Sequence, residues 1–245
     1  MLLLLPFVIY SQESEQAKPK VLGPSDTVRE FYRLLREKQY REGFALSVYA
    51  SAIEGLSEEE LAELVPDFEQ TFSEIPKEIK LYGEQTSGNV ATVFMKSSDD
   101  PADMRVEEVT LLKVDGRWRV GDEQTYEMVK AAGNRFFFEA KMYVNEQNVE
   151  RQVGKLIGAQ KLYVDSRGRY ANIDELIEAN FWFASQRSLE ISGYKIGMEL
   201  SEDKKSYWIH AEPLVYGRTG KHSFYADVNG IHRVDNGGKV FRKSK

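Results

Sequence analysis

Hydrophobic residues in the first third of the chain recur every three or four positions, the pattern of helices with one apolar face. Ser25 or Asp26 can cap the first of these helices, and Glu30 lies near the capping-box position. A second helix is expected over 42–52. A third is expected to begin at Ser57, with Glu60 as its capping-box partner. The apolar positions that define the first and third helices are Val28, Phe31, Leu34, Leu35, Leu61, Leu64, Val65, Phe68 and Phe72.

After Pro76 the hydrophobic period changes to two, which indicates β-strands. The positions that define this alternation are Ile79, Leu81, Val90, Thr92, Phe94, Val106, Glu108, Thr110, Leu112, Trp118, Val120 and Asp122. Asp115-Gly116 is expected to form a tight hairpin turn, because this dipeptide accepts the backbone angles of such a turn. The pattern therefore predicts three helices followed by an antiparallel meander.

Residues 124–165 return to helical spacing and are expected to form one long helix or a pair of helices. Gly133-Asn134 is a possible break in this segment. Its later half carries a stripe of mostly apolar residues at Val149, Val153, Leu156, Ile157 and Gln160.

The chain closes with a predicted β-hairpin. Its strands are expected at 223–227 and 231–234, joined by a type I′ turn at Asn229-Gly230. Gly230 is expected to have a positive φ angle. Arg233 is interpreted as a surface residue of the second strand, with weak solvated contacts.

The three helices and the meander, which ends in LLKVDGRWRVGDE, resemble NTF2-like domains over roughly residues 25–125. This resemblance implies a cone of three helices on a curved antiparallel sheet, often with a pocket between sheet and helices. The ligand-binding residues it suggests are Tyr82, Phe94, Trp118 and Asp122. Some relatives are isomerases or dehydratases, and Asp67, Asp122, Glu123 and Tyr82 are the acids and donors available for such chemistry.

The second half, roughly residues 136–238, resembles soluble pilin-like (pseudopilin-type) domains. It has a long helix, then a GxYxxxxxL loop with Tyr170 and Leu176, then a YGxTGxxSFYxDxxGxIR pattern. The residues that match the last pattern are Tyr216, Gly217, Thr219, Gly220, Ser223, Phe224, Tyr225, Asp227, Gly230, Ile231 and Arg233, with Asn229 beside the turn glycine. Polar residues at Lys141, Asn145, Glu146 and Gln147 would make membrane insertion of the helix costly, so a filament-forming pilin is not expected.

The expected fold class is therefore α+β, with an NTF2-like cone followed by a pilin-like long helix packed on a small antiparallel sheet. The expected divisions are 1–24, a signal-peptide-like segment and linker; 25–127, the NTF2-like domain; 128–240, the pilin-like domain; and 241–245, a basic tail. Met1 to Gln12 is apolar over about ten residues, the length of a signal-peptide core. Ile9 and Ser11 are candidate −3 and −1 positions for cleavage, although a basic leading region is absent. A secreted or periplasmic location is expected.

Composition narrows the function classes. The 39 acidic and 33 basic residues give a formal charge of −6, which disfavours nucleic acid and anionic membranes as partners. The chain has no cysteine, which excludes thiol catalysis, disulfides and cysteine zinc sites. No stable membrane span is expected in the mature chain, and no cofactor is expected.

Two features of the second half could be taken for metal sites. The segment 227–235 superficially resembles part of a calcium loop, but Ile231, His232 and Arg233 stand where an EF-hand would continue with acidic residues. His210, His222 and His232 fit either a zinc cluster or three separate sheet residues, and the latter is favoured because no further ligands stand at suitable spacing. Phe181, Trp182 and Phe183 are likewise interpreted as core residues rather than a ligand cage.

The sequence thus favours a non-enzymatic binding or interaction protein that is secreted or in the bacterial envelope, with an unknown protein partner. Through the pilin-like resemblance, it suggests an accessory to a type II secretion or pilus-like system. The alternative is a carrier of a small apolar ligand, or a lyase or isomerase, that uses the NTF2-like pocket. An apolar cavity holding a buried acid with a raised pKa would favour the enzyme.

Because no metal site is expected, the purified protein should contain no stoichiometric zinc, and calcium should leave its melting temperature unchanged. A ligand present at 100 times its dissociation constant stabilises a folded protein by about 2.7 kcal/mol, which thermal melting detects easily. A calcium-dependent rise in melting temperature that Asp227→Ala abolishes would show that 227–235 binds calcium.

Overall fold

The computed structural model describes residues 21–96 and 105–238, so the expected signal segment and basic tail lie outside the described residues. The fold is α+β, as predicted, with two separate antiparallel sheets. The chain divides into two compact units that interleave along the sequence. The first unit holds the residues up to Val48 together with Glu74–Glu123, and the second holds Tyr49–Ser73 together with the chain from Gln124 onward.

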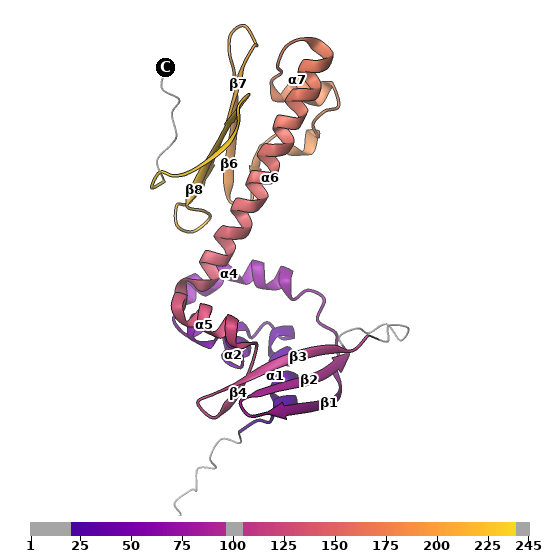
Figure 1. The fold of residues 1–245 in the computed structure, drawn as a ribbon, viewed down its shortest axis with the longest axis vertical. Helices are drawn as coiled ribbons and strands as arrows, with labels where there is room; N and C mark the ends of the chain where they lie inside the picture. The colour runs from indigo at the N-terminus through magenta and orange to yellow at the C-terminus, as the bar shows by residue number, and fades with distance from the viewer. Residues whose placement is uncertain (1–20, 97–104, 239–245) are drawn as a thin grey trace, which may run out of the picture. The chain divides into compact units, whose positions relative to one another are not determined.

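The first unit consists of two helices and a four-stranded sheet. The helices are α1 (Pro24–Arg36) and α2 (Tyr40–Ala45). The strands lie in the order β1 (Lys80–Ser87), β2 (Val90–Lys96), β3 (Glu107–Val114) and β4 (Arg117–Val120), each antiparallel to its neighbour. Helix α1 packs on this sheet (Figure 1). Val28 and the partly buried Tyr32 of this helix join the core.

The sequence patterns predicted most of these elements. The structure differs from the prediction at the start of α1 and in the segment 42–52. Helix α1 is capped by Gly23 and has Pro24 in its first turn, so Ser25 and Asp26 lie inside the helix. Proline suits this position because its missing N–H would have no helical partner. The single helix expected over 42–52 is instead two short ones, α2 and α3 (Ala50–Glu54). The predicted turn at Asp115-Gly116 is confirmed, since Val114 pairs with Arg117 across it.

In β2 and β3 the sheet buries the positions that alternate with those expected from the sequence, whereas Leu81 of β1 and Trp118 and Val120 of β4 pack against the core as the pattern predicts. In β2 the core residues are Ala91, Val93 and Met95, whereas Val90 is exposed and Phe94 is only half-buried. In β3 the core residues are Val109 and Leu111. A change of one residue in register exchanges the two faces of a strand. The sequence VATVFM is apolar on both faces, so its pattern alone does not fix which face is inside.

The second unit consists of helices and a five-stranded sheet. Its main helices are α3, α4 (Glu58–Thr71), α5 (Glu123–Ala132), α6 (Phe136–Arg167) and α7 (Ile173–Glu178), with short 3₁₀ turns at Gly133–Arg135 and Ala184–Gln186. The antiparallel sheet has the order β5 (Glu190–Ile191), β6 (Tyr194–Leu200), β7 (Tyr207–Pro213), β8 (His222–Asp227) and β9 (Gly230–Asp235).

The predicted break at Gly133-Asn134 is confirmed, because the 3₁₀ turn there separates α5 from α6. Helix α6 lies along the sheet (Figure 1). Its predicted stripe is confirmed at Val149, Val153 and Leu156, which are fully buried in a core shared with the sheet residues Ile209 and Phe224. Within the described residues, no helix combines the length and the hydropathy that a membrane crossing requires.

Helix α4 packs within the second unit, although it precedes the first sheet in sequence. Its predicted capping box is present: Ser57 Oγ accepts the Glu60 N–H at 3.2 Å, and a Glu60 carboxylate oxygen accepts the Ser57 N–H at 3.1 Å. The Phe68 ring meets the edge of Phe137 on α6, with ring centroids 5.2 Å apart. The helix expected to be the third of an N-terminal cone therefore shares a core with α6.

The C-terminal hairpin forms with its turn placed one residue earlier than predicted. Asp227 pairs with Gly230, so the loop residues are Val228 and Asn229. The Asn229 N–H donates to Asp227 Oδ1 at 2.7 Å. Gly230 has the expected positive φ, at 128°, a conformation that side chains disfavour.

Gly220 occupies a position where the chain approaches a buried side chain closely. A Cβ built there would lie 1.8 Å from the hydroxyl oxygen of Tyr194, a residue that is fully buried. The packing therefore requires glycine at the second glycine position of YGxTG, Gly220.

We expect Gly220→Ala to destabilise the protein by about 1–3 kcal/mol, because overpacking a rigid core forces neighbouring groups to move. Urea denaturation measures this change. Gly158→Ala is the matched control: a methyl group added at this α6 position would have no atom within 4 Å, so the same substitution should be neutral or stabilise the helix by up to about 1 kcal/mol. Equal effects of the two substitutions would contradict the close approach of Tyr194.

Candidate functional site

The residues expected to bind a ligand in the N-terminal domain do not form one site. Trp118 packs with the core on the helix-covered face of the sheet. Phe94 alternates with the core residues Val93 and Met95, which places its side chain on the opposite face. Tyr82 lies at a β-bulge between Leu81 and Gly83 and is 62% exposed.

The acids considered for this pocket are also dispersed. Asp122 and Glu123 follow β4 and are exposed. Asp67 belongs to α4 and therefore to the second unit. The first unit thus does not assemble the proposed acids around one cavity.

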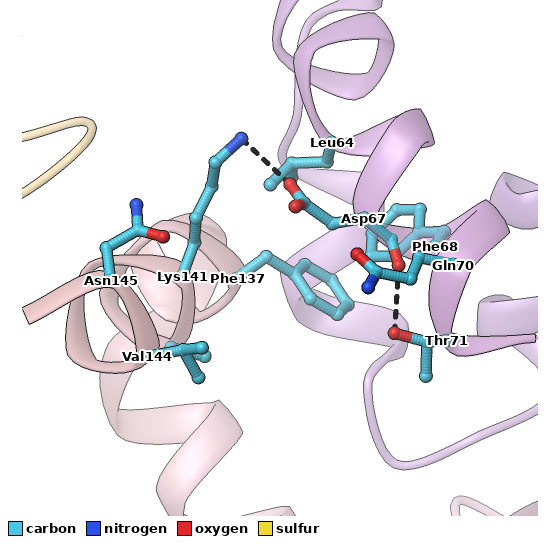
Figure 2. Close-up of a pocket in the computed structure, with 10 residues that line it drawn as sticks. Leu64, Asp67, Phe68, Gln70, Thr71, Phe137, Lys141, Val144 and Asn145 are labelled. Carbon is cyan, nitrogen blue, oxygen red and sulfur yellow. Dashed lines mark hydrogen bonds and ion pairs between the residues drawn. The ribbon is translucent and has the colours of Figure 1, made fainter. Parts of the chain in front are cut away.

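The second unit contains an open groove between α4 and α6, with a volume of about 500 Å³ (Figure 2). Leu64 and Phe68 line it from α4, and Phe137 and Val144 line it from α6. Leu64, Phe68 and Phe137 are buried, whereas Val144 is 55% exposed. The groove is therefore an apolar surface that the described part of the chain leaves partly open.

Three polar contacts hold the wall of the groove in place. Lys141 Nζ of α6 reaches across to Asp67 Oδ2 of α4 at 2.8 Å (Figure 2). It also donates to the Glu63 carbonyl oxygen at 3.4 Å. Thr71 Oγ1 donates to the Asp67 carbonyl at 2.8 Å. The ion pair sits at the edge of an apolar surface, so the groove offers a hydrophobic floor with charged groups at its rim.

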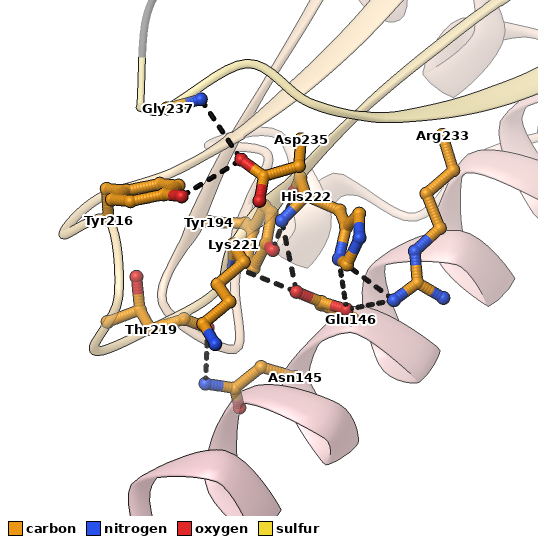
Figure 3. A network of polar contacts seen from close by, with 10 residues as sticks. All are labelled: Asn145, Glu146, Tyr194, Tyr216, Thr219, Lys221, His222, Arg233, Asp235 and Gly237. Carbon is orange, nitrogen blue, oxygen red and sulfur yellow. Dashed lines mark hydrogen bonds and ion pairs between the residues drawn. The ribbon is translucent and has the colours of Figure 1, made fainter.

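A polar cluster further along α6 joins that helix to the C-terminal sheet (Figure 3). Its centre is the Glu146 carboxylate, whose side chain is only 5% exposed. One carboxylate oxygen accepts the N–H groups of Lys221 at 2.8 Å and His222 at 3.1 Å. The other lies 3.0 Å from His222 Nδ1 and 2.5 Å from an Arg233 guanidinium nitrogen.

The electrostatics of this cluster favour the ionised form of Glu146 at neutral pH. Burial by itself raises the pKa of a carboxyl group, but the donated N–H groups of Lys221 and His222 and the contact with the His222 side chain outweigh it and lower the pKa of Glu146 below 4.5. Burial also raises the pKa of Tyr194, whose hydroxyl donates to the His222 carbonyl at 2.8 Å. Neither group is prepared to exchange a proton near neutral pH.

The cluster corrects the interpretation of Arg233 as a weakly bound surface residue, because this side chain pairs with a buried carboxylate.

Hydrogen bonds beside the cluster account for the other motif residues in and near the loop at 214–220. The Tyr216 hydroxyl donates to Asp235 Oδ1 at 2.9 Å, and the Val215 N–H donates to Thr219 Oγ1 at 3.1 Å. The Thr219 carbonyl accepts from Asn145 of α6 at 3.0 Å. The motif residues thus close the loop by hydrogen bonds and attach it to α6.

The remaining motif residues are structural in the same sense. Gly217 has a φ of 75° in the loop, and its N–H donates to the Gly220 carbonyl at 2.9 Å. Phe224 is fully buried in the core of the second unit. The Tyr225 ring stacks on the neighbouring rings of Trp208 and His232.

Sequence reasoning missed Glu146 as the centre of this cluster. The available signal was its spacing, because Glu146 precedes Val149 and Val153 by three and seven residues and so lies on the same stripe of α6. A carboxylate on an apolar stripe requires donors. Its donors are distant in sequence, which the pattern cannot reveal.

The aromatic and histidine candidates fall into separate environments. Trp182 is buried, as expected for a core residue, whereas Phe183 is 73% exposed. His222 contacts Glu146, His232 stacks on Tyr225, and the ring of His210 lies over Gly197. In the described ranges, no three histidine, aspartate or glutamate residues gather in a way that could hold a metal ion, and metal binding itself stays a prediction.

No protein-family model matches the chain, and no curated protein matches it. Among solved structures, the chain is similar to a crystal structure from Campylobacter jejuni described as a "Putative NTF2-like transpeptidase". The two share 17% sequence identity with a TM-score of 0.29, over 40% of this chain and 97% of that chain. A likeness this remote carries no argument about function.

We expect Glu146→Gln to destabilise the second unit by about 1–3 kcal/mol at pH 7, because the buried donors lose a charged acceptor. A depressed carboxyl pKa contributes stability that is complete above the unfolded value of about 4.5 and disappears as pH falls through the folded value. The difference between wild type and variant should therefore shrink on acidification below about pH 4.5.

Urea denaturation at several pH values measures this difference. Glu150→Gln, a change on the same helix, is the control and should alter stability by no more than about 0.5 kcal/mol. A gap between wild type and Glu146→Gln that stays constant from neutral to strongly acidic pH would contradict the ionised, donor-bound state of Glu146.

Proposed function

We propose that this protein is a non-enzymatic binding protein of the bacterial envelope or of the secreted fraction, and that it recognises a polypeptide partner through the groove between α4 and α6. The single observation that carries the proposal is the groove itself. It is an open apolar groove with a volume of about 500 Å³ and with the half-exposed Val144 on its wall. Open apolar surfaces held by rigid elements are typical of interaction sites.

The chemistry of the buried polar groups supports binding over catalysis. A general acid or base needs a pKa close to the working pH. The carboxyl groups whose pKa departs from the ordinary value in the described part of the chain all depart downward, including Glu146 and Glu175, the latter to about 2. Lowered values suit structural ion pairs, and the separation of Tyr82, Phe94, Trp118 and Asp122 removes support from the alternative of a lyase, isomerase or carrier.

We propose the NTF2-like assignment of the first unit and the pilin-like assignment of the second unit on the basis of resemblance. The order of helices and a four-stranded antiparallel meander suits an NTF2-like first unit, and a long helix on an antiparallel sheet suits a pilin-like second unit. An accessory role in a type II secretion or pilus-like system would follow from the second assignment. Fold alone does not assign function, so the groove carries the argument.

Site-specific photo-crosslinking tests this proposal. A benzophenone amino acid at Val144 should give a discrete, light-dependent adduct of higher mass in cells of the source organism, because the groove wall would contact the partner. Leu162 is the matched control, since it lies on the same helix with nearly the same exposure, 56% against 55%. Mass spectrometry of the adduct identifies the attached polypeptide.

The absence of an adduct at Val144, or the same adducts at both positions, would contradict a polypeptide-binding role for the groove. A small apolar molecule that remains bound to the purified protein in native mass spectrometry, and is lost in Val144→Asp, would show that the groove holds a small ligand instead of a polypeptide.

A further inference from the structure

Helix α4 forms the acidic wall of the groove. Its sequence EEELAELVPDFEQT contains six acidic residues and no lysine or arginine. Glu59, Glu63 and Asp67 are spaced four residues apart, so they form one row along the helix. This row lies beside the row of Leu64 and Phe68, which lines the groove. Lys141 pairs with Asp67, and the exposed Glu59 and Glu63 continue the negative edge beyond it.

Both walls of the groove are helices, and this restricts the form of an occupant. A partner segment that adds to a sheet needs a strand edge with unpaired N–H and C=O groups. Most backbone groups of α4 and α6 are paired within the helices, apart from those at the helix ends and the Ala62 carbonyl, whose helical donor would be the N–H that Pro66 lacks. A segment bound here must satisfy its own backbone hydrogen bonds, which an α-helix does. Its apolar side chains can then pack between the ridges of α4 and α6.

We infer that the occupant of the α4/α6 groove is an amphipathic helix of a partner protein with lysine or arginine residues beside its apolar face. The apolar face packs on Phe68, Phe137 and Val144, and the basic residues lie along the edge formed by Glu59 and Glu63. This inference rests on the proposed binding role of the groove and names the chemistry of its partner.

The experiment uses three fluorescein-labelled peptides of 18 residues and the full chain. The first peptide places leucine and lysine at helical spacing, the second has the same composition in a scrambled order, and the third replaces every lysine by glutamate. Fluorescence anisotropy should show saturable binding of the first peptide, weaker binding of the other two by about tenfold or more, and a loss of affinity at high salt.

Variants assign the binding to the groove. Val144→Asp should weaken the leucine-lysine peptide about tenfold, because it buries a charge against the apolar face. Leu162→Asp, the matched change on the exposed part of the same helix, should not. Glu63→Lys should weaken binding and reduce its salt dependence, whereas Glu202→Lys, an exposed acid in the β6–β7 loop, should have little effect. Circular dichroism of each variant verifies that it is folded.

The outcomes separate this inference from the proposed function. If the leucine-glutamate peptide binds as tightly as the leucine-lysine peptide and Val144→Asp weakens both, the groove binds helices but the inferred basic character is wrong. If Leu162→Asp and Glu202→Lys weaken binding as much as the groove variants, the attraction is general and the inference fails. A concentration-dependent dimer that Val144→Asp abolishes would assign the groove to a second copy of this chain.

Discussion

The second unit depends on the burial of one carboxylate, that of Glu146. An ionised group removed from water costs several kcal/mol unless donors replace the lost hydration. The donors here are the Lys221 and His222 N–H groups and the Arg233 guanidinium, which belong to two neighbouring strands and the loop before them. Helix α6 supplies the buried carboxylate, and the C-terminal hairpin with the residue before it supplies its donors.

This attachment extends to the groove through the same loop. Arg218 follows Tyr216 and Gly217 in the loop, pairs with Glu60 at the start of α4 at 2.8 Å, and lies over the Phe138 ring of α6 at 4.1 Å from its centroid. A loop fixed by Glu146 at one side thus reaches α4 at the other. Contacts that begin at the polar cluster therefore support the groove wall, which gives the motif a structural role.

Sequence patterns predicted the features that local interactions decide. The Ser57 capping box, the Asp115-Gly116 turn and the interruption at Gly133 each depend on a few consecutive residues, and each is present. Features decided by distant partners were misplaced. Which face of β2 lies toward the core was ambiguous, because Val90, Val93 and Phe94 supply apolar side chains to both faces.

Dependence on partners distant in sequence also explains why the candidate site could be predicted only in part. Glu146 lies on the α6 stripe, but its donors come from residues 221–233, so its purpose could not be predicted from spacing. Asp67 was singled out as an acid, yet its partner Lys141 lies on a helix that sequence analysis assigned to another domain. Likewise, the groove needs α4 and α6 together, and no local pattern links them.

The interleaving of the two units also orders events during synthesis. Helix α4 leaves the ribosome first, the entire four-stranded sheet follows, and only then does α6 appear. During that interval Leu64 and Phe68 have no partner from α6, because Phe137 has not yet been made. The side of α4 that carries Leu64 and Phe68 therefore completes its packing only after the whole four-stranded sheet has been made.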